Sequence, residues 1–282
     1  MKWIVVGARG MLGQDVTDLL GSRGEQVHAL GRQELDVLDA PAVAAALEGA
    51  DVVVNCAAYT AVDAAEDHEA DAFALNAVGA AHVARAAAAH GARVVHVSTD
   101  YVFDGAARAP YGEDAPIAPS SAYGRTKAAG EWAVLAASAQ NMVVRTAWLY
   151  GAGGGCFPRT IVRVARERGG VAVVTDQIGQ PTWTRDVAET IARLVEADAP
   201  GGIYHATSSG EASWYEFARS AVEAAGLDAD SVTPVTSESF VRPAPRPAYS
   251  VLGHERSRGA GVEPIGDWRD RWALAASEVL AG

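Results

Sequence analysis

The chain begins with MKWIVVGARGMLG, residues 1–13, in which a short apolar run leads directly into three spaced glycines. The run at 3–6 predicts a buried β-strand, and the residues from Met11 onward predict a helix. Gly7, Gly10 and Gly13 stand between the two, where glycines allow a tight turn and a close approach of backbone amides to a diphosphate. Their spacing is G-x-x-G-x-x-G rather than the usual G-x-G-x-x-G. The position after a strand and before a helix still favours a dinucleotide site over a purely structural loop.

Further β-branched apolar runs alternate with alanine-rich segments along the rest of the chain. Strands are expected at 27–30, 51–58, 93–98, 142–148 and 171–176, and helices at 11–20, 41–48, 66–90, 121–139, 157–168, 184–197 and 213–226. This alternation predicts an α/β fold, a doubly wound parallel sheet of the Rossmann type. We expect residues 1–180 to form the dinucleotide-binding domain. Residues 181–282 should form mainly a smaller C-terminal substrate-binding lobe, with some segments returning to the first domain.

The charge and the cysteines limit the classes of function. A formal net charge of −12 over 282 residues argues against a nucleic-acid partner, because binding to phosphates needs a basic face. Two cysteines, Cys56 and Cys156, cannot form a disulfide framework and fit a reducing compartment. The first apolar run is too short for a signal peptide or a membrane span. We therefore expect a cytoplasmic protein without a membrane partner.

The end of the second expected strand normally contacts the adenosine ribose of a dinucleotide. Here it reads Leu30-Gly31-Arg32, without the acidic residue that would bind a 2′-hydroxyl. Because an arginine suits a 2′-phosphate, we expect NADPH as cofactor, with NADH as the alternative. A solvated surface arginine remains the other interpretation of Arg32. The remaining positions expected along the cofactor, beside the adenine or where small residues follow the third strand, are Asp36, Val37, Ala57, Ala58 and Tyr59.

The stretch SAYGRTKAAGE, residues 120–130, places Tyr123 and Lys127 four positions apart, on one face of an expected helix. Thr99 stands at the end of the strand expected at 93–98. A neighbouring ammonium favours the phenolate, so we expect Lys127 to lower the pKa of Tyr123 from its usual ~10 and to make it a proton donor. Thr99 would donate a hydrogen bond to a substrate oxygen. The alternative is an exposed tyrosine beside a surface lysine.

These residues together resemble the short-chain dehydrogenase/reductase superfamily over the first 180 positions. Within it, the chain is similar over nearly its whole length to the dTDP-4-dehydrorhamnose reductase family. The similar segments are NCAAYTAVDAAE at 55–66, STDYVFDG at 98–105, AYGRTKAAGE at 122–131, VRTAWLYG at 144–151, DQIGQPTW at 176–183 and RPAPRPAYSVL at 242–252.

This resemblance implies NADPH-dependent reduction of the 4-keto group of a dTDP-4-keto-6-deoxysugar, most simply of dTDP-4-dehydrorhamnose to dTDP-L-rhamnose. It implies that Thr99, Tyr123 and Lys127 carry catalysis, with Lys127 also on the nicotinamide ribose. It further implies that Asp100 and Trp148 line the deoxysugar, although Asp100 could equally cap the following turn. Residues implied to touch the cofactor are Gly10, Met11, Leu12, Asp36, Ala57, Ala58 and Tyr59.

The diphosphate, the metal and the assembly are less defined by the sequence. Arg242 and Arg246 are candidates for the diphosphate because guanidinium groups match phosphate oxygens, and surface arginines are the alternative. Some family members are dimers that hold magnesium between acidic side chains. Asp15 and Glu189 are candidate remnants of those positions, but the set is not matched, so we predict no metal. A monomer or a homodimer is expected. Two other functions stay open: a nucleotide-sugar 4-epimerase with tightly bound NAD, and a non-catalytic regulatory subunit of the same fold.

Overall fold

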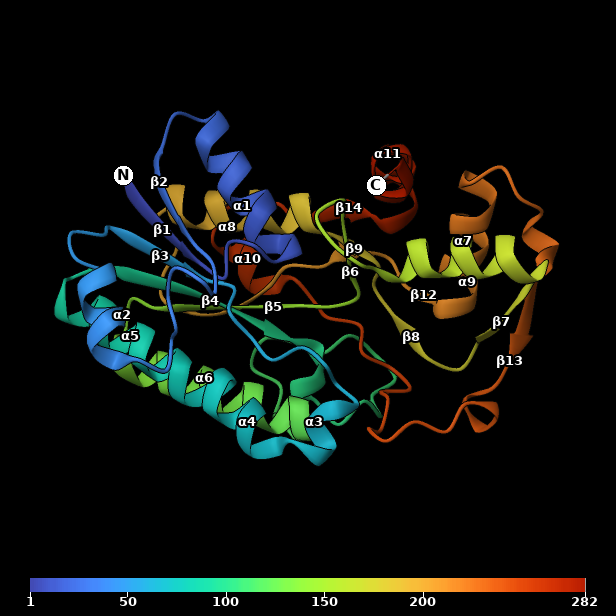
Figure 1. Ribbon diagram of the computed structural model, residues 1–282, viewed down its shortest axis with the longest axis horizontal. Coiled ribbons are helices and arrows are strands. Elements are labelled where there is room, and N and C mark those ends of the chain that lie inside the picture. Colours follow the sequence, from blue (N-terminus) through green and yellow to red (C-terminus); the bar gives the residue numbers. More distant parts are fainter. Residues whose placement is uncertain (282) are drawn as a thin grey trace.

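Six parallel strands form the central sheet of the computed structural model, which describes residues 1–281 (Figure 1). In sheet order they are β10 (Gly202–His205), β5 (Met142–Thr146), β4 (Arg93–Thr99), β3 (Val52–Asn55), β1 (Lys2–Val6) and β2 (Gln26–Leu30). From β1 the chain first winds outward to β2 and then returns to β3 on the other side. A sheet of this kind takes its ligand at that reversal, outside the carboxyl ends of the strands. The predicted doubly wound parallel sheet is confirmed.

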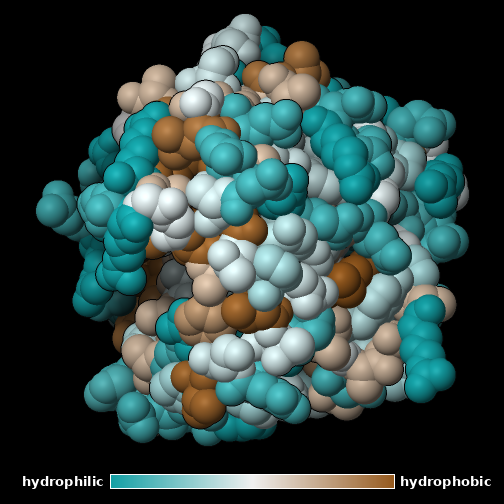
Figure 2. Space-filling model, turned by 90° about the vertical axis from the view of Figure 1, so that its right-hand side faces the viewer, coloured by the Kyte–Doolittle hydropathy of each residue, from teal (hydrophilic) through white to brown (hydrophobic). Residues whose placement is uncertain are grey.

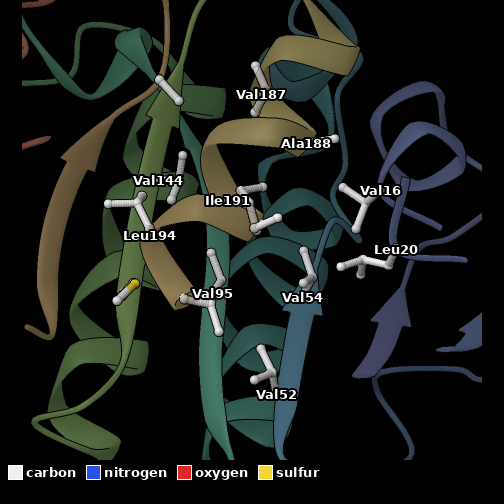
Figure 3. Packing of buried hydrophobic residues seen from close by; sticks show 14 of the residues in the cluster. Val16, Leu20, Val52, Val54, Val95, Val144, Val187, Ala188, Ile191 and Leu194 are labelled. Atoms are coloured by element: carbon white, nitrogen blue, oxygen red, sulfur yellow. The ribbon is translucent and has the colours of Figure 1, made fainter. Parts of the chain in front are cut away.

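Helices cover both faces of this sheet. One face carries α1 (Met11–Ser22) and α8 (Thr184–Glu196), and the other carries α2 (Ala40–Ala46), α5 (Ala80–Ala89) and α6 (Ala122–Ala137) (Figure 1). Figure 3 shows the first interface, where Leu20 and Ile191 point toward valines of the sheet. Alternate residues of a strand face opposite sides, so Val95 belongs to this cluster and Val94 to the other. Burial on both faces explains why the strands read as continuous apolar runs.

A smaller lobe lies beyond the carboxyl edge of the sheet, on the right in Figure 1. It contains α7 (Phe157–Arg168), α9 (Trp214–Ala224) and α11 (Trp268–Ala281) around an aromatic core in which Phe217 packs against Trp268 and Trp272. Three two-stranded pairs belong to this part of the chain: β7 (Val171–Val174) with β13 (Val232–Val235), β8 (Ile178–Gly179) with β12 (Ala212–Ser213), and β6 (Leu149–Tyr150) with β9 (Thr182–Trp183). A further pair joins β11 (Ser208–Ser209) to β14 (Ile265–Asp267), and α10 (Glu255–Gly259) contacts β10.

Two of the expected elements differ from the structure. The strand expected at 171–176 forms, but it pairs with β13 in the lobe, and the sixth strand of the central sheet is β10. The single helix expected at 66–90 is divided into α3 (Ala64–Asp67), α4 (Glu69–Phe73), the π-helical turn η1 (Ala74–Gly79) and α5. The side chain of Asn76, in η1, accepts a hydrogen bond from the backbone of Tyr59 at 2.8 Å. Such wide turns are frequent at functional sites.

The chain passes between the sheet and the lobe more than once. The helix α7 and the strand β7 precede residue 180 and lie in the lobe. After residue 180, α8 packs on one face of the central sheet and β10 is one of its strands. The division at residue 180 therefore stays a prediction. Figure 2 shows the face that carries the lobe: it is mostly hydrophilic, and its hydrophobic residues form small separate patches. Along residues 1–281, every helix is too short or too polar to cross a bilayer.

Candidate active site

A cavity of about 580 Å³ opens at the carboxyl edge of the central sheet. Its wall is made by the turn after β1, the ends of β4 and β5, and the first turns of α6. This is where a doubly wound sheet binds its ligand. Of the residues predicted from the sequence, those in the wall are Gly10, Met11, Leu12, Gly13, Ala58, Thr99, Asp100, Tyr123, Lys127 and Trp148.

The turn after β1 can be built only with glycine at two positions. Gly7 has a φ of +78°, and a Cβ atom there would lie 2.6 Å from the backbone nitrogen of Ala57. A Cβ atom at Gly13 would collide with the carbonyl oxygen of Gly7. Gly10 stands at the N-cap position of α1 and has no side chain that could cap the helix. The first amides of α1 therefore remain available at the cavity. Uncapped amides at a helix N-terminus suit a phosphate, which is what a dinucleotide would present here.

The adenosine end of the predicted site has a second arginine that sequence reasoning missed. Arg9 lines the cavity, and its guanidinium lies 2.9 Å from Glu34, whose other oxygen accepts a hydrogen bond from the Gly31 backbone. Arg32 is exposed and stands outside the cavity wall. Its role toward a 2′-phosphate stays a prediction. The position of Arg9 inside the glycine turn itself could have drawn attention to it.

Two residues that were predicted to contact the cofactor, Val37 and Asp36, contact other parts of the protein instead. Val37 is buried in the hydrophobic cluster under α2 and α5, where its side chain closely approaches Gly79. Asp36 is exposed, and its carboxylate accepts a hydrogen bond from the Leu38 backbone at 3.0 Å. Neither lines the cavity. Their contact with adenine therefore remains a prediction.

The loop after β3 closes the crevice opposite the glycine turn. Asn55 accepts a hydrogen bond from the Ala57 backbone at 3.2 Å, which together with the Asn76 contact to Tyr59 fixes the loop. Ala58 and Cys56 line the cavity. Burial raises the pKa of the Cys56 thiol to about 12, so it is protonated and a poor nucleophile.

Thr99 and Tyr123 come from two elements that contact each other closely. The hydroxyl of Thr99, at the end of β4, donates to Asp100 at 2.9 Å and accepts from the Tyr101 backbone at 3.3 Å. Helix α6 begins after Ser121, whose side chain accepts from the Gly124 backbone at 3.1 Å. A Cβ atom at Gly124 would collide with the Tyr101 carbonyl. This close contact brings the first turn of α6, with Tyr123, against the end of β4.

The pKa of Tyr123 moves in the direction opposite to the prediction. Burial raises it to about 12, contact with the Thr99 hydroxyl opposes this rise, and the carboxylate of Asp100 adds to it. Lys127 is not among the groups that shift it. The predicted lowering is wrong because burial dominates the pKa of this phenol and the amine of Lys127 does not oppose it. At neutral pH the phenol therefore carries its proton, as a proton donor must.

Lys127 is buried, with only 2% of its surface exposed, which rules out the alternative of a surface lysine. Its side-chain nitrogen donates to the carbonyl of Val97 at 2.6 Å and lies 3.4 Å from the imidazole of His96. Burial lowers the pKa of Lys127 to about 8, against the opposing charge of Glu131. The amine therefore changes its charge close to neutral pH.

Asp100 is a buried carboxyl group in the cavity wall, and its pKa is raised to about 6 by burial. One of its oxygens accepts from Thr99, and the other has no partner of good hydrogen-bond geometry within residues 1–281, although the nearby Ser250 hydroxyl opposes the rise in the pKa. It is Thr99 that caps the short helical turn at Asp100–Val102. A buried oxygen that faces a cavity without a partner suits a polar group of a ligand.

Trp148 is held in a conformation that few bulky residues adopt. Its φ is +46°, its indole stacks on Trp214 of α9 with ring centroids 3.5 Å apart, and Gly179 leaves room for it. Backbone strain of this kind is concentrated at functional sites. One neighbour in the wall, Thr146, was missed by sequence reasoning, and its buried hydroxyl has no hydrogen-bond partner among the described residues. It lies directly across from Thr99 in the sheet, which a paired-strand alignment could have revealed.

The two arginines predicted for the diphosphate converge on one carboxylate. Arg246 lies 2.9 Å from Asp63 and Arg242 lies 3.9 Å from it. Neither lines the cavity, so their phosphate contacts stay predictions. In residues 1–281, histidine, cysteine and acidic side chains form no group of three or more that could hold a metal ion.

A family model described as the RmlD substrate binding domain matches residues 1–280. The chain belongs to this family. It is 49% identical over 284 residues to a probable dTDP-4,6-dihydroxy-2-methyloxan-3-one 4-ketoreductase of Streptomyces antibioticus, covering 100% of this chain and 96% of the relative. It is 48% identical to a dTDP-4-dehydrorhamnose reductase of Streptomyces griseus, covering 95% and 90%. The predicted family of dTDP-4-dehydrorhamnose reductases is confirmed.

A solved RmlD-family structure also matches over the whole fold. The dTDP-4-dehydrorhamnose reductase of Bacillus anthracis, crystallised in complex with NADP, is 35% identical and superposes with a TM-score of 0.94. The match covers 99% of this chain and 100% of that one. This chain therefore shares its sheet and its lobe with a reductase that was crystallised in complex with NADP.

Proposed function

We propose that this protein reduces the 4-keto group of a dTDP-4-keto-6-deoxysugar with NADPH, converting dTDP-4-dehydrorhamnose to dTDP-L-rhamnose. One observation carries the proposal: a hydroxyl, a protonated phenol and a buried amine, from Thr99, Tyr123 and Lys127, line the same cavity as the glycine turn after β1. Both curated relatives are named as 4-keto reductases of dTDP-linked sugars.

The residues present fit a dinucleotide. The turn around Gly7 has no room for a side chain, and the uncapped amides of α1 lie at the cavity, so these would hold the diphosphate. Arg9 and Arg32 would face the adenosine end, where a 2′-phosphate needs cations. When bound, the cofactor supplies the hydride for the carbonyl carbon.

The protein's own groups would handle the proton and the developing charge. Tyr123 holds its proton at neutral pH and would give it to the alkoxide oxygen as that oxygen becomes basic. Thr99, already linked to Asp100, would donate to the same oxygen and fix its direction. Lys127, in its charged form, would stabilise the phenolate that remains and bond the ribose.

The sugar would lie between the sheet and the lobe. Asp100 presents a carboxyl oxygen without a partner, and Trp148 offers an aromatic face held by the stack on Trp214. Because Trp214 belongs to α9, we assign residues 181–282 mainly to substrate binding and residues 1–180 mainly to the cofactor. Arg242 and Arg246 would reach the diphosphate of the sugar nucleotide. A cytoplasmic location, and a monomer or homodimer, complete the proposal.

Purified protein mixed with NADPH and dTDP-4-keto-6-deoxysugars tests this function. We expect one NADPH consumed for each sugar reduced, and NMR of the product gives the configuration at C4. Tyr123→Phe should lose most of the turnover and keep its affinity for NADPH. Tyr150→Phe is the matched control, because it removes a buried hydroxyl that has no hydrogen-bond partner and packs in the lobe core. Turnover without added cofactor, with NAD retained on the protein, would instead indicate an epimerase.

A further inference from the structure

A buried histidine lies beneath the amine of Lys127. His96 is on β4, three residues before Thr99, and its side chain faces α6. It lies between the apolar part of this layer, which contains Val94 and Val143, and buried polar side chains nearer the carboxyl edge. It has no exposed surface. Its Nε2 atom lies 3.4 Å from Nζ of Lys127, and its Nδ1 atom lies 3.2 Å from Nδ2 of Asn55. The ring thus connects the amine to the loop after β3.

The hydrogen bonds of Asn55 determine which ring nitrogen carries the proton. The oxygen of Asn55 accepts from the Ala57 backbone at 3.2 Å, so its amide nitrogen faces Nδ1 of His96. An amide nitrogen only donates, and therefore Nδ1 must accept. Burial lowers the pKa of His96 well below its usual value, so the ring is neutral and has a single proton. That proton is on Nε2, the atom that faces Lys127.

This tautomer affects the charge of the lysine. An ammonium can only donate, so it does not form a hydrogen bond with the Nε2–H group of His96, whereas a neutral amine has a lone pair that accepts one. The carbonyl of Val97 takes one hydrogen of the amine in either state. The contact with His96 therefore favours the neutral form of Lys127.

We propose that His96 is a positioning residue for the reduction: held by Asn55 with its proton on Nε2, it holds the side-chain nitrogen of Lys127 in the cavity wall when that amine is neutral, and so limits the pH range in which the charged amine is available. Its kinetic consequence rests on the proposed reductase function, because only there does the charge of Lys127 act on Tyr123 and the ribose. The tautomer itself does not depend on that function.

The other groups around the lysine do not provide this effect. Glu131, one turn further along α6, favours the charged amine, but its carboxylate is paired with Arg145 of β5 at 2.7 Å. Cys56, from the loop after β3, is a protonated thiol. Burial lowers the pKa of Lys127 to about 8. In our proposal the Nε2–H group of His96, 3.4 Å away, acts in the same direction. The amine should therefore lose its charge, and the enzyme its activity, as the pH rises through this range.

A histidine that merely fills the core is the competing explanation. Helix α6 packs closely at Gly130, where a Cβ atom would lie 3.5 Å from Nε2 of His96, so the ring also occupies volume. Packing alone, however, requires no particular tautomer and predicts no change in the pH dependence of catalysis. These two consequences separate the explanations.

The first test uses the unaltered protein labelled with ¹⁵N in its seven histidines. We expect His96 to stay neutral between pH 6 and 10, with ¹⁵N shifts of a protonated Nε2 that change as Lys127 loses its proton. Protonation of Nδ1 instead would overturn the proposal. This measurement needs no substrate, so it stands even if every 4-keto sugar fails as substrate, which would count against the proposed function alone.

The second test compares pH profiles of kcat/KM. In His96→Gln the terminal amide can present its oxygen to the ammonium, so the basic limb should move upward by about one pH unit, a tenfold change in the acid constant. His205→Gln is the matched control, since His205 is a buried histidine of the same sheet whose hydrogen bond goes to Gly253. A folded His96→Gln protein whose basic limb coincides with that of the control would show that His96 only fills the core. If the variant does not fold, the ¹⁵N spectrum decides.

Discussion

Replacing Gly7 with alanine tests how strongly the turn after β1 depends on glycine. The residue has a φ of +78°, and an L-residue there costs about 1–2 kcal/mol. The added Cβ atom would lie 2.6 Å from the backbone nitrogen of Ala57 and 2.8 Å from the carbonyl carbon of Cys56. Neither backbone atom can rotate away, so overpacking adds about 1–3 kcal/mol. We expect Gly7→Ala to lower the free energy of unfolding by about 2–5 kcal/mol in all.

The same change also moves the two walls of the predicted cofactor site apart. The loop that contains Ala57 lies opposite the glycine turn, so relief of the collision would widen the crevice between β1 and β3. We expect the Kd for NADPH, measured by fluorescence titration, to rise at least about tenfold, since close approach of the amides is what the turn provides. Urea denaturation measures the loss of stability in the same samples.

Gly21→Ala is the matched control for this prediction. Gly21 is exposed near the end of α1, has no positive φ, and has no atom within 4 Å of the added Cβ. Alanine there should stabilise the protein by up to about 1 kcal/mol and leave NADPH binding unchanged. If Gly7→Ala unfolded at the same urea concentration as Gly21→Ala and bound NADPH as tightly, the reasoning from the close contact would be refuted.

Three further perturbations address the cofactor, the sugar and the buried carboxyl group. Arg9→Ala and Arg32→Ala should each weaken NADPH binding by about tenfold and leave NADH binding unaffected, because each would remove the charge-assisted bond that we propose to the 2′-phosphate. Equal losses for both cofactors, measured by titration, would refute this. Gly179→Ala adds a Cβ atom 2.5 Å from the indole of Trp148, so it should raise the KM for the sugar about tenfold in steady-state assays and leave the Kd for NADPH unchanged. The pKa of Asp100 is about 6 in the folded protein and 3.8 in the unfolded chain. Its contribution to the free energy of unfolding is therefore fully present below pH 3.8 and is lost as the pH rises through 6. Asp100→Asn should therefore gain about 2 kcal/mol over the unaltered protein between pH 4 and pH 7 in urea denaturation, whereas a constant difference would show that the carboxyl group is not buried as described.

The central sheet was predictable because its strands are buried on both faces. Continuous runs such as the one at 93–98 need only local sequence to be recognised, and the glycines after β1 mark the crevice. The partner of a short strand is set by distant parts of the chain, so the placement of β7 with β13 was not predictable from four residues. The π-helical turn was also missed. Its residue Asn76 contacts Tyr59 in the loop after β3, and the sequence does not indicate that contact.

The candidate site was predictable in its members but not in its electrostatics. Spacing places Tyr123 and Lys127 on one face of a helix, and both line the cavity. Spacing does not give the depth of burial, which raises the pKa of Tyr123 and lowers that of Lys127. Thr146 was missed for a related reason: it reads as an ordinary residue of a β-branched strand until the register of β4 and β5 is known.

Hydride transfer from labelled cofactor tests the central proposal most directly. NADPH carrying two deuterium atoms at the reactive carbon of the nicotinamide is supplied with a dTDP-4-keto-6-deoxysugar, and the product is examined by NMR. The account predicts one deuterium at C4 of each product molecule, and no labelled product from Tyr123→Phe within the same time. A sugar altered at C4 without deuterium, or reduced at the same rate by Tyr123→Phe, would contradict it.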